Sequence, residues 1–112
     1  MFFRKKLGKM QKGEVWWANF PAPMGRRPVL LLSRDSAYIV RTAILVAPLT
    51  ATIRDTPVEV TFEEISSIDS GFVIDLDSIM TVPISILTEP IARLAKEKME
   101  DVHKALSFAF DL

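Results

Sequence analysis

The sequence predicts a small, mainly β protein: an antiparallel barrel that ends in one α-helix. Three observations predict it. The chain has 112 residues, which is enough for one domain but not for two. Its apolar runs are short and closely spaced, as in small barrels rather than in alternating β–α–β units. Near the C-terminus the apolar spacing changes to three or four residues, which is typical of a helix.

The composition excludes several other classes of protein. Hydrophobic residues make up 49% and charged residues 25%, with 4 glycines and 7 prolines, so disordered, collagen-like and low-complexity chains are excluded. No cysteine is present, which excludes disulfides, thiolate metal sites and cysteine nucleophiles. No apolar run approaches the roughly 18 residues of a membrane span, and the opening residues lack the pattern of a secretory signal. We therefore expect a cytoplasmic protein with no membrane partner.

The first elements follow from local composition. Residues 1–12 are basic and lack periodicity, which predicts a flexible arm that does not pack and leaves residues 13–112 as the domain. Glu14–Phe20 is rich in β-forming residues and ends at a pair of prolines, which predicts the first strand. Pro21–Arg27 contains prolines, a glycine and two arginines, which predicts a loop with a cationic tip.

The middle of the chain predicts four or five strands. Pro28–Ser33 and Thr42–Pro48 are continuous apolar runs, as in strands that are covered on both faces. Residues 56–62 alternate apolar and polar side chains, which predicts a strand with one face in water. Gly71–Ile74 and Asp77–Val82 predict two further short strands or one bent strand.

The last part of the chain predicts an edge strand and then a helix. Glu89–Leu94 contains Pro90, which a sheet tolerates only at an edge or at the first position of a strand. A helix over roughly residues 96–109 is predicted by four apolar residues on one stripe: Met99, Val102, Leu106 and Phe110. The whole chain therefore predicts five to seven strands and one helix.

The zero net charge conceals a division along the chain. Residues 1–54 carry ten basic and two acidic side chains, whereas residues 55–112 carry four basic and twelve acidic ones. Such an asymmetry favours a polyanionic partner for the basic part. Solvation of exposed faces is the simpler explanation of the same charges.

Several candidates for chemistry have a simpler explanation. The single histidine, His103, lies at the flank of the apolar stripe of the predicted helix, where a surface histidine is expected rather than a metal ligand. Asp75 and Asp77 would share one face of a strand, as acid–base pairs can, although solvated acids explain them as well. Trp16 and Trp17 must point to opposite faces of the first strand, so one is expected in the core and the other outside or at an interface.

A stronger candidate is a pair of arginines near two threonines. Arg26 and Arg27 stand between a glycine-containing loop and an apolar strand that Pro28 rigidifies. A guanidinium held there matches phosphate oxygens in a bidentate way and stays charged at any working pH. The hydroxyls of Thr50 and Thr52 follow a neighbouring apolar strand and could hydrogen-bond the same phosphate. The pattern predicts a phosphate-binding site.

The order of these segments is typical of one bacterial family. Gly13–Trp16 with Phe20 and Pro21 comes first, then Gly25–Asp35, then Val46–Ala51; Leu76–Val82 and Ile91–Leu94 match more loosely. On these segments the chain resembles the MazF/PemK family of toxin endoribonucleases from toxin–antitoxin systems. The resemblance covers about residues 13–112, nearly the whole chain.

The resemblance implies an SH3-like barrel of the CcdB/PemK type that acts as a homodimer on single-stranded RNA. It implies cleavage without a metal or other cofactor, leaving a 2′,3′-cyclic phosphate and a 5′-hydroxyl, and neutralisation by a cognate acidic antitoxin. By position, Arg27 and Thr50 match the family's catalytic arginine and threonine. The residues expected to contact RNA are Gly25, Arg26, Pro28, Thr52 and Arg54.

The chemistry that the resemblance implies is physically reasonable for this chain. The RNA's own 2′-hydroxyl is the nucleophile, so the protein needs only to orient it and to neutralise the charge that grows on the phosphorane. An arginine with a pKa above about 12 is a poor base, so Arg27 is expected to stabilise charge. DNA lacks the 2′-hydroxyl and should survive.

Three positions depart from the family pattern. Met80 stands where many relatives have an arginine, the loop Pro21–Arg27 is short, and Ala95 occupies a helix N-cap where serine or threonine is usual. Two alternatives therefore stay open. One is a DNA gyrase-binding toxin like CcdB, although the ending Phe110–Leu112 lacks the Trp-Gly-Ile that this would require. The other is a family member that binds RNA or a partner without cutting.

Overall fold

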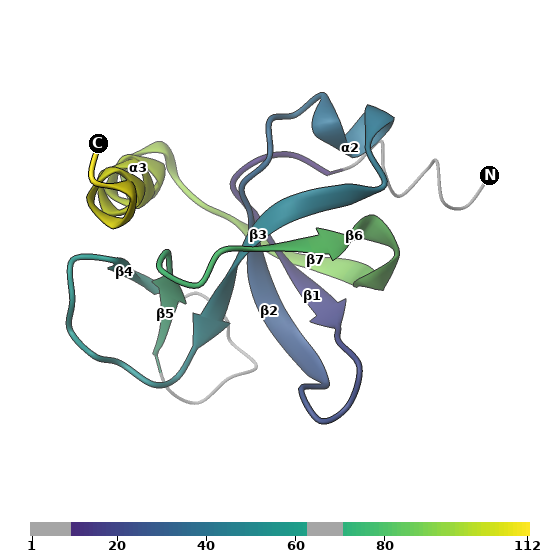
Figure 1. Cartoon of the computed structure of the whole chain (residues 1–112), viewed down its shortest axis with the longest axis horizontal. Helices are drawn as coiled ribbons and strands as arrows, with labels where there is room; N and C mark the ends of the chain where they lie inside the picture. Colours follow the sequence, from purple (N-terminus) through teal and green to yellow (C-terminus); the bar gives the residue numbers. More distant parts are fainter. Residues whose placement is uncertain (1–9, 63–70) are drawn as a thin grey trace.

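The computed structural model describes residues 10–62 and 71–112. They form one curled antiparallel sheet, with a helix beside the end of the sheet that β4 and β5 form (Figure 1). The strands run β4-β5-β3-β2-β1-β7 across the sheet, and β6 pairs with β3 off this path. The elements are β1 (Glu14–Asn19), β2 (Arg26–Leu31), α2 (Ala37–Val40), β3 (Ala43–Thr50), β4 (Glu59–Phe62), β5 (Phe72–Asp75), β6 (Met80–Pro83), the 3₁₀ turn η1 (Ile84–Ile86), β7 (Leu87–Arg93) and α3 (Lys96–Phe110).

The central strand, β3, has three partners. On one edge it pairs with β2, from Val29 opposite Pro48 to Leu31 opposite Val46. On the other edge its first four residues pair with β6 and its last two, Leu49 and Thr50, pair with β5. The prediction of a mainly β barrel with a C-terminal helix is confirmed, in the form of a half-barrel that curls around β3.

Two apolar layers lie on the two faces of the central strands. Successive side chains of a strand point to opposite faces, so β1, β2 and β3 each contribute to both layers. The first layer includes Trp16, Val29, Val46 and, from α2, Tyr38; the second includes Val15, Leu30, Ala47 and, from α3, Val102. Coverage on both faces explains the continuous apolar runs of β2 and β3, as predicted.

β2 begins two residues earlier than the sequence predicts. It spans Arg26–Leu31 rather than starting at Pro28, so both arginines lie on a strand and not on a loop tip. Arg26 pairs with Asn19 and Arg27 with Ala18 of β1. A proline is tolerated inside this strand because pairing with β3 begins only after it, at Val29, so its missing amide interrupts no pair with β3.

The strands from β3 onward lie where the sequence predicts them, but several begin or end at other residues. β3 extends past Pro48 to Thr50. β4 is shorter than predicted because the amide of Glu59 donates to the carbonyl of Thr56 at 3.0 Å and closes a turn there. Within β4 the predicted alternation is confirmed by buried Val60 and Phe62. β5 and β6 are separate strands, and β7 is an edge strand, as Pro90 predicts.

The predicted helix is confirmed as α3, over Lys96–Phe110. The prediction that Phe110 belongs to its buried apolar stripe is wrong. Val102 and Ala105 are buried, whereas Phe110 is 58% exposed. Steps of four residues each turn the helix by about 40° beyond a full turn, so Phe110 has rotated away from the face that Val102 and Ala105 define. His103 is exposed, as predicted for a surface histidine.

Residues 10–12 pack against the domain and do not form the flexible arm that the sequence predicts. Residues 1–9 lie outside the described residues. Met10 is only 3% exposed and packs in the first apolar layer, and the amide of Lys12 donates to Asp35 at 2.8 Å. Residues 10–12 are therefore part of the packed domain. The four-residue helix α2 was not predicted, because it is too short to show a helical period.

No helix in residues 10–62 and 71–112 is long and apolar enough to cross a membrane.

Candidate functional site

Arg27 and Thr50 lie at the ends of adjacent strands and on the same face of the sheet. The last pair between β2 and β3 is Val29 with Pro48. Arg27 lies two residues before Val29 on β2, and Thr50 lies two residues after Pro48 on β3. Their side chains therefore point to the same face. Beyond the pair the two strands diverge (Figure 1), which leaves an arginine on one side of the opening and a threonine hydroxyl on the other.

The Arg27 side chain is held at its Nε and exposed at its two terminal nitrogens. Its Nε donates to the carbonyl of Met24 at 2.9 Å, which ties the side chain to the β1–β2 turn. Its terminal nitrogens make no other polar contact within the described part of the chain. The exposed guanidinium can therefore present two donors to an anion.

Arg26 points to the opposite face from Arg27. Its guanidinium carbon lies 4.2 Å from the centre of the Trp17 ring, and it forms an ion pair with Glu89 of β7. Trp17 is half-buried and Trp16 buried, as predicted for neighbours on opposite faces. The structure thus separates the two arginines that are adjacent in the sequence.

Gly25 shapes the turn that precedes both arginines. Its φ of 70° lies in the left-handed region that favours glycine, and its carbonyl accepts the amide of Phe20 at 2.9 Å. Pro28, which follows the arginines, is buried in β2. Gly25 and Pro28 therefore fix the strand that carries Arg27, and buried Pro28 has little surface left for a ligand.

The segment after β3 begins with a local hydrogen bond. The hydroxyl oxygen of Thr50 accepts the amide of Thr52 at 3.1 Å. Because a hydroxyl also carries a proton, Thr50 keeps a donor for an outside acceptor. The side chain of Thr52 is exposed, so the structure brings Thr50 and Thr52 together at one edge of the site.

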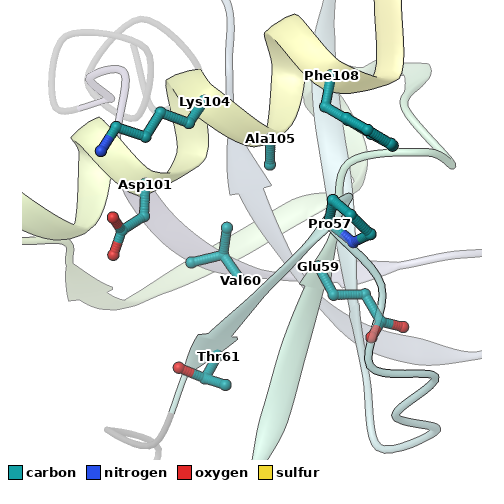
Figure 2. A pocket seen from close by; sticks show the side chains of 8 residues that line it. All are labelled: Pro57, Glu59, Val60, Thr61, Asp101, Lys104, Ala105 and Phe108. Atoms are coloured by element: carbon teal, nitrogen blue, oxygen red, sulfur yellow. The ribbon is translucent and has the colours of Figure 1, made fainter.

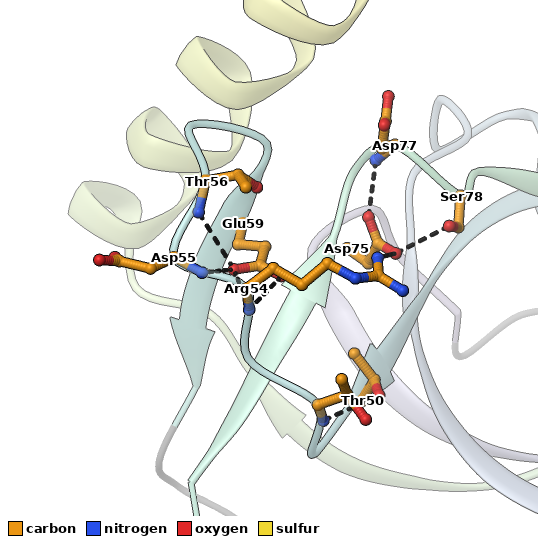
Figure 3. A network of polar contacts seen from close by, with 9 residues as sticks. Thr50, Arg54, Asp55, Thr56, Glu59, Asp75, Asp77 and Ser78 are labelled. Carbon is orange, nitrogen blue, oxygen red and sulfur yellow. Dashed lines mark hydrogen bonds and ion pairs between the residues drawn. The ribbon is translucent and has the colours of Figure 1, made fainter.

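A buried carboxylate joins two loops beside Thr50 (Figure 3). Asp75 is 6% exposed and accepts the amide of Asp77 at 3.0 Å and the hydroxyl of Ser78 at 2.7 Å. Its Oδ2 also lies 4.0 Å from the guanidinium of Arg54. The network ties the β3–β4 loop to the turn after β5.

The predicted arrangement of Asp75 and Asp77 is wrong. Asp75 ends β5 and Asp77 lies in the following turn, so the two do not share a face of a strand. Asp75 is not a solvated acid either, because it is buried and fully used by neighbouring donors. The sequence signal was available in the Asp-x-Asp-Ser pattern, which is typical of a side chain that caps its own turn.

Glu59, the first residue of β4, was missed by sequence reasoning. Its carboxylate accepts the amides of Arg54, Asp55 and Thr56 (Figure 3). In the sequence it is one polar residue of an alternating strand, and nothing there distinguishes it from Thr61. The structure shows that it holds the loop that carries Arg54.

Met80 contributes packing and no charge. It lies opposite Val46 in the β3–β6 ladder, and it is partly buried against the first apolar layer together with Phe20 and Ile86. Position 80 is therefore apolar on the face that Val46 and Arg27 share.

A cavity of about 430 Å³ lies between β4 and α3. Figure 2 shows side chains from the helix on one side and from β4 and its preceding turn on the other. The lining residues are Pro57, Glu59, Val60, Thr61, Asp101, Lys104, Ala105 and Phe108. None of them belongs to the predicted phosphate site, so the cavity is separate from Arg27 and Thr50.

Comparison with known proteins identifies a family. Residues 11–110 match the model of PemK-like, MazF-like toxins of type II toxin–antitoxin systems. The chain is 42% identical over 101 residues to the probable endoribonuclease MazF5 of Mycobacterium tuberculosis, covering 89% of this chain and 92% of that protein. It is 31% identical over 86 residues to endoribonuclease MazF3 of the same organism, covering 77% and 84%.

Solved structures of similar proteins have the same fold. The toxin MazF-mt6 of Mycobacterium tuberculosis superposes with a TM-score of 0.79 at 28% identity, covering 88% of this chain and 97% of that chain. A mycobacterial endoribonuclease in complex with its cognate antitoxin superposes with a TM-score of 0.78 at 22% identity, covering 92% and 96%. The curled sheet and terminal helix described above are therefore those of known toxin structures.

Proposed function

Because the chain belongs to the PemK-like, MazF-like family of toxins and is an endoribonuclease of that family, we propose that it cuts single-stranded RNA by attack of the RNA's own 2′-hydroxyl. The reaction needs no metal ion. The observation that carries the proposal is the position of Arg27 and Thr50, which face the same side at the ends of two adjacent strands. Arg27 and Thr50 are the proposed catalytic residues.

The two side chains suit the charge that develops during the cut. The 2′-oxygen attacks the adjacent phosphorus, the bond to the 5′-oxygen breaks, and a 2′,3′-cyclic phosphate and a 5′-hydroxyl result. Negative charge grows on the non-bridging oxygens, where the guanidinium of Arg27 and the hydroxyl of Thr50 can donate hydrogen bonds. The proton lost by the 2′-hydroxyl is balanced by the proton that the 5′-oxygen gains.

The surrounding residues are proposed to hold the RNA. Arg54 and Thr52 lie on the loop that follows Thr50 and are exposed, so they can contact phosphates next to the one that is cut. Arg26 of β2 and Trp17 of β1 lie on the opposite face of the sheet and offer a charged and aromatic surface on which a neighbouring nucleotide can stack. Gly25 and Pro28 contribute by shaping the strand between them.

We also propose two protein partners. A second copy of the chain completes a homodimer, and a cognate acidic antitoxin silences the enzyme. Solved relatives include an endoribonuclease in complex with its cognate antitoxin and the MazE–MazF complex of Deinococcus radiodurans. An acidic segment of the antitoxin, bound to this chain, would compete with RNA phosphates for Arg27 and so block the site.

Cleavage of a long single-stranded RNA in EDTA tests the proposed chemistry. The wild-type protein is expected to cut at recurring short sequences and to leave 5′-hydroxyl ends, which polynucleotide kinase labels without prior phosphatase treatment. Arg27→Ala should lose at least about a hundredfold in rate, as expected for loss of a donor to the transition state. Arg41→Ala, which removes an exposed arginine at the end of α2, is the matched control and should cut normally.

The result also decides between cleavage and binding alone. Met80 supplies no cation to the face of Arg27, which favours a non-cleaving RNA-binding protein as the second candidate. Intact RNA after long incubation, together with retention of the RNA in a gel-shift assay, would support that candidate. Normal cutting by Arg27→Ala would refute the proposed role of Arg27.

A further inference from the structure

The loop between β3 and β4 is folded around one carboxylate. The Glu59 carboxylate accepts the amide of Asp55 at 2.7 Å, that of Arg54 at 3.0 and 3.1 Å, and that of Thr56 at 3.3 Å. All three donors are main-chain groups of consecutive residues, and they converge on one half-buried side chain (Figure 3). Consecutive amides that point to one place form an anion-binding concavity. We call residues 54–56 with Glu59 the amide cradle.

The amide cradle holds a backbone shape that the loop would not adopt by itself. Asp55 has a φ of 59°, in the left-handed region that costs a residue other than glycine roughly 1 kcal/mol. The carboxylate compensates for this cost, because hydrogen bonds to a charged acceptor are about twice as strong as neutral ones. The loop is therefore shaped by Glu59 rather than by the side chains of the loop itself.

The residue that benefits from this shape is Arg54. Its amide donates to the Glu59 carboxylate. Its guanidinium lies 4.0 Å from the carboxylate of Asp75, and the Arg54 side chain remains 67% exposed. At the other end of the loop Thr50 accepts the amide of Thr52. Both ends of the segment 50–56 are thus fixed, and the charge of Arg54 is directed to the side of the loop where Thr50 and Asp75 lie (Figure 3).

We propose that Glu59 is a positioning residue for RNA binding. By accepting the amides of residues 54–56, Glu59 fixes the backbone of Arg54. The guanidinium is thereby already aimed at an RNA phosphate next to the one cut between Arg27 and Thr50. Glu59 does not touch the RNA, because its carboxylate is occupied by amides. The inference rests on the proposed RNA-cutting function and adds to it a residue that acts through Arg54.

Substitution of Glu59 should change KM rather than kcat. A contact to a phosphate that is not cut is made equally in the bound state and in the transition state, so its loss weakens binding without slowing the chemical step. Glu59→Ala is expected to raise KM about tenfold, the effect of losing one charge-assisted hydrogen bond, with kcat nearly unchanged. Glu59→Gln keeps one carbonyl oxygen in the amide cradle and should give an intermediate KM.

A double-mutant cycle with Arg54→Ala tests whether Glu59 acts through Arg54. If it does, Glu59→Ala adds nothing once Arg54 is already alanine, and the double mutant has the KM of Arg54→Ala alone. Glu100→Ala, which removes an exposed glutamate from α3, is the matched control and should leave KM unchanged. Circular dichroism monitors folding, and Glu59→Gln serves for the cycle if Glu59→Ala does not fold.

The cycle is run in parallel on binding of a 2′-O-methyl RNA that cannot be cut. Additive losses, or a Glu59→Ala variant with wild-type KM and affinity, would refute the positioning role while RNA cleavage stands. If the wild-type protein binds RNA but leaves it intact, the proposed chemistry fails and the binding cycle still decides the role of Glu59. If it binds no RNA at all, both proposals are wrong.

Discussion

Arg26 and Arg27 are adjacent in the sequence and have different surroundings. Arg26 lies over the ring of Trp17 and is paired with Glu89. Among the described residues, Arg27 is tied only to the carbonyl of Met24, and its side chain is exposed. Cation–π contacts at exposed sites contribute about 0.5–1 kcal/mol, and surface ion pairs about 0–1 kcal/mol. Arg26 therefore has a structural role that Arg27 lacks.

This difference predicts opposite profiles for two matched variants. Arg26→Gln should lower the free energy of unfolding by about 1 kcal/mol and reduce RNA cleavage only moderately. Arg27→Gln should leave unfolding within about 0.5 kcal/mol of wild type and abolish cleavage. Urea denaturation followed by tryptophan fluorescence measures the first property, and a cleavage assay the second. Equal losses of stability in both variants would contradict the distinction.

Tyr38 is the only tyrosine of the chain and is fully buried. Burial, followed by the charges of Asp35 and Glu14, raises the pKa of Tyr38 well above its usual value of 10.0. Its hydroxyl donates to the carbonyl of Ser33 at 2.9 Å. The folded state thus favours the neutral phenol. Its contribution to stability is fully present below the unfolded pKa and is lost as the pH rises above it, toward the folded pKa.

Stability should therefore fall in alkaline solution in a way that depends on Tyr38. The free energy of unfolding of the wild type is expected to decrease as the pH rises from about 10, and this decrease should be smaller in Tyr38→Phe. The variant also loses the hydrogen bond to Ser33, at a cost of about 1 kcal/mol near neutral pH. Because there is one tyrosine, ultraviolet absorbance of tyrosinate follows its titration directly. A midpoint near 10 in the folded protein would contradict the effect of burial.

At the scale of the element, α3 has a weak start. Its N-cap residue, Ala95, has extended backbone and no side chain that could accept an amide. Serine at this position would accept an amide from the first turn, which is worth about 1 kcal/mol. We expect Ala95→Ser to raise the free energy of unfolding by about that amount, measured by urea denaturation. Ala95→Val, which has no acceptor, is the control and should not stabilise; an equal gain in both would contradict capping.

The sequence was most informative where an element repeats a simple pattern. Alternation identified β4, and three-to-four spacing identified α3, because burial on one face imposes these periods. The first and last residues of the elements were harder to predict. The strand start at Arg26 could not be predicted from a segment rich in prolines and arginines, since it depends on pairing with Asn19 of β1. α2 is too short to show a period.

The candidate site was predicted in part. Arg27 and Thr50 were part of a predicted phosphate-binding pattern, and the resemblance gave them catalytic roles; the structure has them on one face of adjacent strands. The contribution of Glu59 could not be predicted, because it depends on backbone amides that converge on one point only when the loop folds. That of Asp75 was missed although the Asp-x-Asp-Ser pattern carried a signal for it. Local hydrogen bonds to the main chain are typical of serine, threonine, asparagine and aspartate, so a glutamate three to five residues from its donors gives no such signal.

At the scale of the whole molecule, the two oppositely charged parts of the sequence are interleaved. β3 from the basic part pairs with β5 and β6 from the acidic part, and β1 pairs with β7. Basic side chains of the first part therefore lie beside acidic ones of the second, as Arg26 does beside Glu89 and Arg54 beside Asp75. Their fields largely cancel at distances beyond the Debye length of about 10 Å. RNA binding must depend on a few local contacts rather than on a broad basic surface.

This interleaving predicts a weak salt dependence of RNA binding. Contacts from Arg26, Arg27 and Arg54 to three phosphates would give a slope of about −2 for the logarithm of affinity against that of salt concentration, at roughly 0.7 per contact on a single strand. Arg54→Gln should make the slope less steep by about 0.7. Fluorescence anisotropy with an RNA that cannot be cut measures both. A slope several times steeper would contradict a local interface.

The amide cradle has a consequence for how such a protein can change over generations. Its donors are main-chain groups, and every amino acid except proline carries one. Mutations at Asp55 and Thr56 can therefore alter the surface beside Arg54 while the loop keeps its shape, provided that position 55 tolerates a left-handed backbone, as glycine and asparagine do. A library randomised at these two positions would explore new RNA preferences on an intact scaffold, so the rim of the site can diversify faster than its catalytic pair.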